Sequence, residues 1–148
     1  MQGLHITADC HQCACDSALL TDATLLTALC TKAVTDAGLQ AVAQLFHTFP
    51  ATAHGPGGVT ATVLLAESHL CVHTWPEQRA VTLDVYVCNF GGDHSAKAEA
   101  LMAALQGVLL PGQVQVNRLV RGSNQAGALV PALGRCDMHH GDERATVR

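Results

Sequence analysis

Residues 67 to 77 concentrate side chains that can take part in catalysis. They read E-S-H-L-C-V-H-T-W-P-E, so a serine hydroxyl, two imidazoles and a thiol lie within a few residues of one another. Trp75 is the only tryptophan of the chain, and Pro76 follows it. A strand that served only to build a core would not need this mixture, which indicates a functional site.

Ser68, His73 and Cys88 are the first candidates for chemistry, because they can lie on one face of a sheet. A Ser–His hydrolase would need its serine on a sharp turn, commonly within G-x-S-x-G. Glu67 precedes Ser68 and no glycine flanks it, which argues against that class. A Cys–His pair of His73 with Cys88 or Cys71 stays open, as does a structural role for any single histidine.

Cysteine and histidine also gather at both ends of the chain. Two groups could supply metal ligands: Cys10, His11, Cys13 and Cys15 near the start, and Cys136, His139 and His140 near the end. A structural zinc site needs four well-spaced ligands, and C-x2-C-x-C is not a regular zinc knuckle. We therefore expect no metal, and a Cys/His metal-binding module is a minor alternative.

Length and composition restrict the class of protein. With 148 residues, 49% of them apolar, the chain is expected to form one domain with a core of small side chains. A net charge of about −4 without a basic run gives no indication of nucleic-acid binding. No apolar run approaches the ~20 residues that span a bilayer, and the N-terminus lacks the charged-then-apolar pattern of a signal peptide. These features, with an odd number of cysteines, predict a cytoplasmic protein.

Alternating and helical patterns predict the elements that position these residues. Alternation predicts strands at residues 4–8, 40–49, 59–66, 80–88 and 113–121, with 69–74 continuing extended until Pro76. A first helix, capped by Thr21 or Asp22, carries its apolar stripe over residues 25–37 and precedes Gly38. A second, capped by Asp93, carries its stripe over residues 98–109 and ends before Pro111.

The predicted order is βαβββαβ. A mostly antiparallel sheet with both helices on one face buries every apolar stripe, which makes the fold a two-layer α/β sandwich of the α+β class. The other face of the sheet keeps Thr, His, Cys and Tyr side chains, and so suits a site or a partner. We expect residues 1–122 to form this domain and residues 123–148, which are Gly-rich and polar, to form a loose tail.

The string from Glu67 to Glu77 closely resembles the self-cleavage site of the small prokaryotic S-adenosylmethionine decarboxylases. The resemblance covers most of residues 3–121 and extends to four further motifs: Gly3-x-His5, Phe46 to Phe49, Asp84 to Cys88, and Arg121-Gly122. It implies that the Ser68 hydroxyl attacks the Glu67 carbonyl and that the chain then divides into residues 1–67, the β chain, and 68–148, the α chain. Ser68 would become a pyruvoyl cofactor that forms a Schiff base with the substrate's amine.

The resemblance also implies roles for individual residues. His73 matches the base that takes the α-proton of residue 68, and Cys88 matches the donor that returns a proton to the substrate carbon. Phe49 and Trp75 match aromatic residues that flank adenine, and Glu77 matches an acceptor for ribose hydroxyls. The implied product is the aminopropyl donor of spermidine synthesis, and the implied assembly is a homodimer with its sites at the interface.

Three positions depart from the family pattern. Thr60 stands where a serine usually assists processing, the loop of residues 50–58 is longer than expected, and Val120 stands where an acidic residue is common. All three are expected near the substrate end of the site. They therefore leave open a pyruvoyl-dependent ornithine or arginine decarboxylase on the same fold.

Overall fold

The structure is a computed structural model that describes residues 2–53 and 55–122. The expected tail, residues 123–148, lies outside the described residues, and the second group of cysteine and histidine lies within that tail. None of the helices described is long and apolar enough to cross a membrane.

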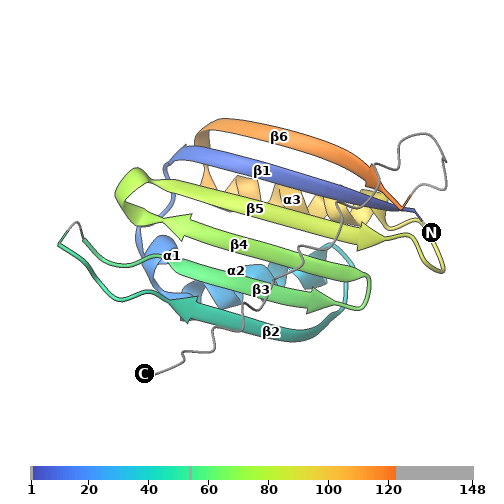
Figure 1. Ribbon diagram of the computed structural model, residues 1–148, viewed down its shortest axis with the longest axis horizontal. Helices are drawn as coiled ribbons and strands as arrows, with labels where there is room; N and C mark the ends of the chain where they lie inside the picture. Colours follow the sequence, from blue (N-terminus) through green and yellow to red (C-terminus); the bar gives the residue numbers. More distant parts are fainter. Residues whose placement is uncertain (1, 54, 123–148) are drawn as a thin grey trace, which may run out of the picture.

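Six strands of the described chain form one sheet in the order β2-β3-β4-β5-β1-β6, and every neighbouring pair is antiparallel. The strands are β1 (Gly3–Cys13), β2 (Ala41–Thr48), β3 (Val59–Leu65), β4 (Ser68–Trp75), β5 (Ala80–Cys88) and β6 (Pro111–Arg121). The helices are α1 (Ala18–Thr21), α2 (Ala23–Asp36) and α3 (Ser95–Leu109), with a 3-10 turn η1 (Pro76–Gln78). The helices lie behind the sheet in Figure 1 and leave its other face open. The predicted two-layer α+β sandwich is confirmed.

The extended run predicted from residue 59 to 74 is two strands instead of one. Leu65 pairs with Ser68, so β3 and β4 form a hairpin whose turn is made by Ala66 and Glu67. Both strands carry a buried apolar row, and pairing them side by side places both rows on the inner face of the sheet. Neither glycine nor proline marks this reversal, which is why the sequence pattern does not show it.

The first strand is also longer than predicted, because it continues through the cysteine group to Cys13. Cys10, Cys13 and Cys15 are buried. Burial raises the pKa of Cys10 to about 11, so its thiol stays neutral and serves packing. The Arg79 guanidinium donates hydrogen bonds to the carbonyl oxygens of Cys13 and Cys15 and thereby holds the chain after the strand.

Both long helices begin near the predicted caps. The Asp22 carboxylate accepts from the backbone N–H groups of Thr24, at 2.7 Å, and Leu25, which satisfies two free donors at the start of α2. The Asp93 carboxylate accepts from Ser95 N, the first residue of α3, although His94 occupies the capping position itself.

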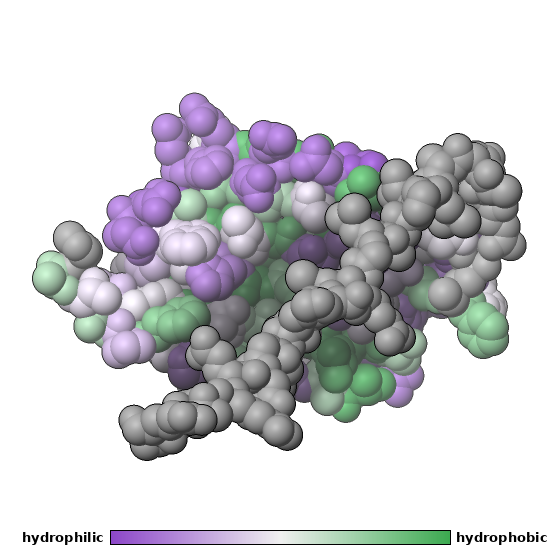
Figure 2. Space-filling view, in the orientation of Figure 1, coloured by the Kyte–Doolittle hydropathy of each residue, from purple (hydrophilic) through white to green (hydrophobic). Residues whose placement is uncertain are grey.

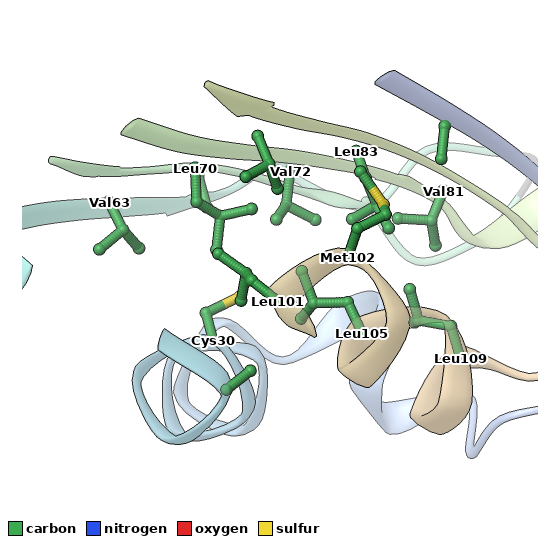
Figure 3. Packing of buried hydrophobic residues seen from close by; sticks show 14 of the residues in the cluster. Cys30, Val63, Leu70, Val72, Val81, Leu83, Leu101, Met102, Leu105 and Leu109 are labelled. Carbon is green, nitrogen blue, oxygen red and sulfur yellow. The ribbon is translucent and has the colours of Figure 1, made fainter. Parts of the chain in front are cut away.

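The core lies between the helices and the inner face of the sheet. Figure 3 shows strand side chains such as Leu70 and Leu83 pointing toward the helices, and Leu101 and Leu105 of α3 pointing toward the strands. The outer face carries the alternate residues of each strand, which are only partly buried. Figure 2 views this open face, with hydrophilic side chains along β6 at the top and a hydrophobic patch near β2 at the bottom.

Candidate active site

The turn between β3 and β4 holds the peptide bond between Glu67 and Ser68. The Glu67 carbonyl oxygen accepts a hydrogen bond from the backbone N–H of Cys88, with 2.8 Å between nitrogen and oxygen. The Glu67 carboxylate in turn accepts from the backbone N–H of Gln40 at 3.3 Å. This peptide group is therefore held between β5 and the start of β2.

Ser68 does not follow the regular alternation of β4. It is in register with Leu65 and Val87, both buried, so a regular strand would turn its side chain toward the helices. The turn at residues 66–67 resets the alternation, and Ser68 has a φ of 156°, which non-glycine residues rarely adopt. Its hydroxyl lies 3.3 Å from Nδ1 of His69, a residue of the open face.

A network of polar side chains continues from His69 across three further strands. Nε2 of His69 and Nε2 of His5 lie 3.5 and 2.8 Å from the same Asp84 carboxylate oxygen. Arg121 lies 3.4 Å from Nδ1 of His5, with its guanidinium carbon 4.8 Å from the centre of the Tyr86 ring. These residues therefore form one cluster beside Ser68.

Sequence reasoning found His5, Asp84 and Arg121 only as motif positions and gave His69 no role. The signal that could have found them is that alternate residues of a strand lie on the same face of the sheet. Alternation places His69, Asp84 and His5 on the open face, as it does Cys88. Only the strand register, in which Tyr86 pairs with both His5 and His69, makes them neighbours.

The other predicted residues lie at the opposite end of β4. The His73 ring centre lies 4.4 Å from that of Trp75 and 5.7 Å from that of Phe49. A pocket of about 440 Å³ adjoins these rings and is also lined by Glu77. Trp75 and Phe49 are each 40% exposed, so ring surface is available to a ligand.

The loop of residues 50–58 forms much of the wall of this pocket. Pro50, Thr52, Pro56, Gly57 and Gly58 line it. A Cβ atom on Gly57 would lie 2.0 Å from the Phe49 carbonyl oxygen, and one on Gly58 would lie 2.1 Å from that of Thr74. Glycine is therefore needed at both positions for the loop to approach the strands so closely.

The two ends are separated within one chain. His73 lies five residues along β4 from Ser68, a distance of about 16 Å at the usual rise of a strand. Thr60 pairs with His73 and therefore belongs to the Trp75 end. Val120, expected near the substrate end of the site, does not lie at the Trp75 end. It pairs with Leu4, and the neighbouring Gly3 pairs with Cys88.

The Ser68 end and the Trp75 end suit different chemistry, and in the described part of the chain neither is arranged to bind a metal ion. The described residues contain no group of three or more histidine, cysteine or acidic side chains arranged to bind a metal ion. The Ser68 end offers a hydroxyl, an imidazole and a carbonyl whose oxygen already faces an N–H donor, which is the set that an internal acyl transfer needs. The Trp75 end offers flat rings and a carboxylate, which suit a flat heterocycle with hydroxyl groups.

The chain is similar to proteins of one known family. The family model described as S-adenosylmethionine decarboxylase matches residues 4–122. Proteins named S-adenosylmethionine decarboxylase proenzyme are similar to the chain: that of Picrophilus torridus is 34% identical over 82% of this chain and 85% of its own, and that of Acidithiobacillus ferrooxidans is 36% identical over 81% and 82%.

A solved structure gives the same result. The crystal structure of the adenosylmethionine decarboxylase from Aquifex aeolicus superposes with a TM-score of 0.72 and 32% identity, covering 86% of this chain and 97% of that one. The sequence and the fold thus agree, and the chain belongs to the S-adenosylmethionine decarboxylase family.

Proposed function

We propose that the protein cleaves itself between Glu67 and Ser68 and then, with a pyruvoyl group made from Ser68, decarboxylates S-adenosylmethionine. The observation that carries this proposal is the 2.8 Å hydrogen bond from the Cys88 N–H to the Glu67 carbonyl oxygen. Attack of a hydroxyl on this carbonyl places negative charge on that oxygen. A donor already aimed at it lowers the barrier for the attack.

The local backbone supports cleavage at this bond. Ser68 has a φ of 156° at the first position of β4, a backbone conformation that is costly for a residue with a Cβ atom. Conversion of the peptide into an ester through the Ser68 oxygen relieves part of that cost. The intact chain thus has both a polarised carbonyl and a strained nucleophile at one bond.

The residues around Ser68 also suit the later decarboxylation. A pyruvoyl group at position 68 supplies an electrophilic carbonyl that takes up the electron pair left when CO2 departs. Cys88 is half-buried on the open face, and its backbone N–H donates a hydrogen bond to the Glu67 carbonyl oxygen. We assign to the Cys88 thiol the proton that returns to the substrate carbon.

The Trp75 end supports a nucleoside substrate. Phe49 and Trp75 present partly exposed rings beside the pocket, and an adenine can stack on them for about 0.5–1.5 kcal/mol beyond its area burial. A sulfonium centre gains a cation–π contact of similar size. Glu77 is the acceptor that we assign to ribose hydroxyls. Ornithine and arginine have no ring that would use this surface.

A homodimer would bring the two ends together. We propose that two protomers stack through their open faces, about a two-fold axis that runs parallel to the sheets and across the strands. Such an axis lays the Ser68 end of one copy over the Trp75 end of the other, which makes two composite sites. His73 of one copy can then act on residue 68 of the other, with Thr60 beside it.

The open face has side chains that fit this role. Leu64, opposite Ala43, and Leu45 expose apolar surface on this face near β2, and polar residues occupy its centre.

We place the enzyme in the cytoplasm, because the six cysteines of the described residues are all unpaired, as in a reducing compartment.

Mass spectrometry and parallel activity assays test the proposal. The purified protein should give two fragments that meet between residues 67 and 68, whereas Ser68→Ala should remain one chain. Release of CO2 should be measured with S-adenosylmethionine, ornithine and arginine, and we expect it from the first alone. Release from ornithine or arginine alone would overturn the substrate and leave the pyruvoyl chemistry standing. An intact wild-type chain after long incubation would overturn self-cleavage.

A further inference from the structure

The geometry points to His69, held by Asp84, as the general base that activates the Ser68 hydroxyl for attack on the Glu67 carbonyl. This inference rests on the proposed self-cleavage and adds a second histidine to it. Nδ1 of His69 lies 3.3 Å from the Ser68 oxygen, whereas His73 is about 16 Å along the same strand. His69 is thus the imidazole that contacts the nucleophile within its own chain.

The hydrogen-bond network determines which nitrogen of each histidine carries a proton. Arg121 can only donate, so Nδ1 of His5 accepts from it and Nε2 of His5 keeps the proton. That proton is donated to the Asp84 carboxylate over 2.8 Å. The chain of donors therefore runs from β6 through β1 and ends on a carboxylate of β5.

The same carboxylate oxygen determines the tautomer of His69. Nε2 of His69 lies 3.5 Å from it, and a carboxylate can only accept, so the His69 proton belongs on Nε2. Nδ1 then has a free lone pair, and this is the atom that faces the Ser68 hydroxyl. The 3.5 Å to Asp84 is a contact distance, and catalytic hydrogen bonds often form fully only during the reaction.

The resulting step balances without any further reactant. A bond forms between the Ser68 oxygen and the Glu67 carbonyl carbon while the hydroxyl proton passes to Nδ1 of His69. The carbonyl electron pair moves to the Glu67 oxygen, which faces the Cys88 N–H. When the C–N bond breaks, the proton passes from His69 to the Ser68 nitrogen. The products are an ester and a free amine.

His69 and His73 therefore act on successive steps. His69 takes the hydroxyl proton in the acyl shift, and His73 takes the α-proton when the ester is eliminated. The two roles can be separated because hydroxylamine cleaves an ester but not a peptide bond, and it leaves a hydroxamate on residue 67. Mass spectrometry detects that product directly.

The test follows newly synthesised full-length chain over time, with and without hydroxylamine. His69→Ala should slow cleavage by roughly a hundredfold or more, the usual scale of general base catalysis, and should yield no hydroxamate. His73→Ala should also stop cleavage but should accumulate the ester and so yield the hydroxamate. His11→Ala, an exposed histidine at the far end of β1, is the matched control and should cleave like wild type.

A second pair of variants separates a base from a merely structural residue. His69→Asn keeps an acceptor near the position of Nδ1 but cannot exchange a proton at neutral pH, so it should be nearly as slow as His69→Ala. In the His73→Ala background, the rate of ester formation should depend on pH, because only the neutral imidazole of His69 can accept the hydroxyl proton, and His69→Asn should remove that dependence. Asp84→Asn should slow ester formation, because a carboxylate no longer lies beside the imidazolium that forms when His69 takes the proton. The other groups that face His69 are His5, Tyr86 and the Ser68 hydroxyl.

Three results would overturn the inference. The first is cleavage of His69→Ala at the wild-type rate, and the second is accumulation of the ester in His69→Ala. The third is a cleavage rate of His69→Asn equal to that of wild type. A wild-type chain that neither cleaves nor yields hydroxamate would instead overturn the proposed self-cleavage, and this inference with it. Far-UV circular dichroism and the thermal midpoint, compared with those of Ser68→Ala, identify a variant that has lost the fold.

Discussion

The two ends of β4 carry different side chains and are held in different ways. At the Ser68 end, hydrogen bonds join β5, β1 and β6 through Asp84, His5 and Arg121, and a 3.5 Å contact of His69 with Asp84 adds β4. At the Trp75 end, rings contact one another and a loop rich in glycine and proline forms a pocket wall. The first end is built to move protons, and the second is built to hold a flat ligand. Neither end does both within one chain, and the proposed homodimer would bring the two together.

The largest expected effect comes from mixing two inactive chains. Ser68→Ala lacks the nucleophile and His73→Ala lacks the base for elimination, so neither should cleave alone. When the two are co-expressed with different tags, the His73→Ala chain should be cleaved, because its intact Ser68 meets an intact His73 of the Ser68→Ala chain. Tandem purification followed by mass spectrometry measures the cleaved fraction.

The same experiment can show that the two ends do not work together across an interface. If purified mixed dimers contain only intact His73→Ala chain, His73 does not act across the interface. Mixing His73→Ala with a second, differently tagged His73→Ala chain is the matched control, and it should remain uncleaved.

A smaller but still large effect is expected for Cys88→Ala. The substitution removes the thiol and leaves the backbone N–H that bonds to the Glu67 oxygen. Cleavage should therefore continue, whereas decarboxylation should fall by about 10²- to 10⁴-fold, the usual contribution of a general acid. Measuring the cleaved fraction and kcat on one preparation checks both. Loss of cleavage with unchanged turnover by the cleaved fraction would contradict the assignment of the thiol.

The smallest effect is expected at the Trp75 end. Trp75→Ala removes one stacking surface and one cation–π partner, each near 1 kcal/mol, so KM for S-adenosylmethionine should rise roughly ten- to a hundredfold. Cleavage should change less than KM, because the Trp75 ring exchanges no proton in either step of the cleavage. Trp75→Phe keeps a ring and should recover much of the affinity. An unchanged KM in Trp75→Ala would mean that the substrate does not use this pocket.

Much of the fold could be predicted because alternation and helical spacing are local patterns. Val81, Leu83 and Val85 are buried on one side of β5, and Thr82, Asp84 and Tyr86 lie on the other, as predicted. The cap at Asp22 and the close of the first helix before Gly38 were predictable for the same reason. Phe49, Trp75 and Glu77 could be grouped from the family motif, and the structure brings them to one pocket.

The sequence by itself determined most of the elements, the face on which most strand residues lie and the family to which the chain belongs. Only the tertiary structure decided that β3 reverses at Glu67, that His73 is remote from Ser68 in its own chain, and that His69 meets Asp84 and His5. The physical reason is that a period of two sets the face of a residue but not which strand lies beside it. Strand order and register depend on packing the whole sheet against α2 and α3, and these bring residues 5, 69, 84 and 121 together from four strands.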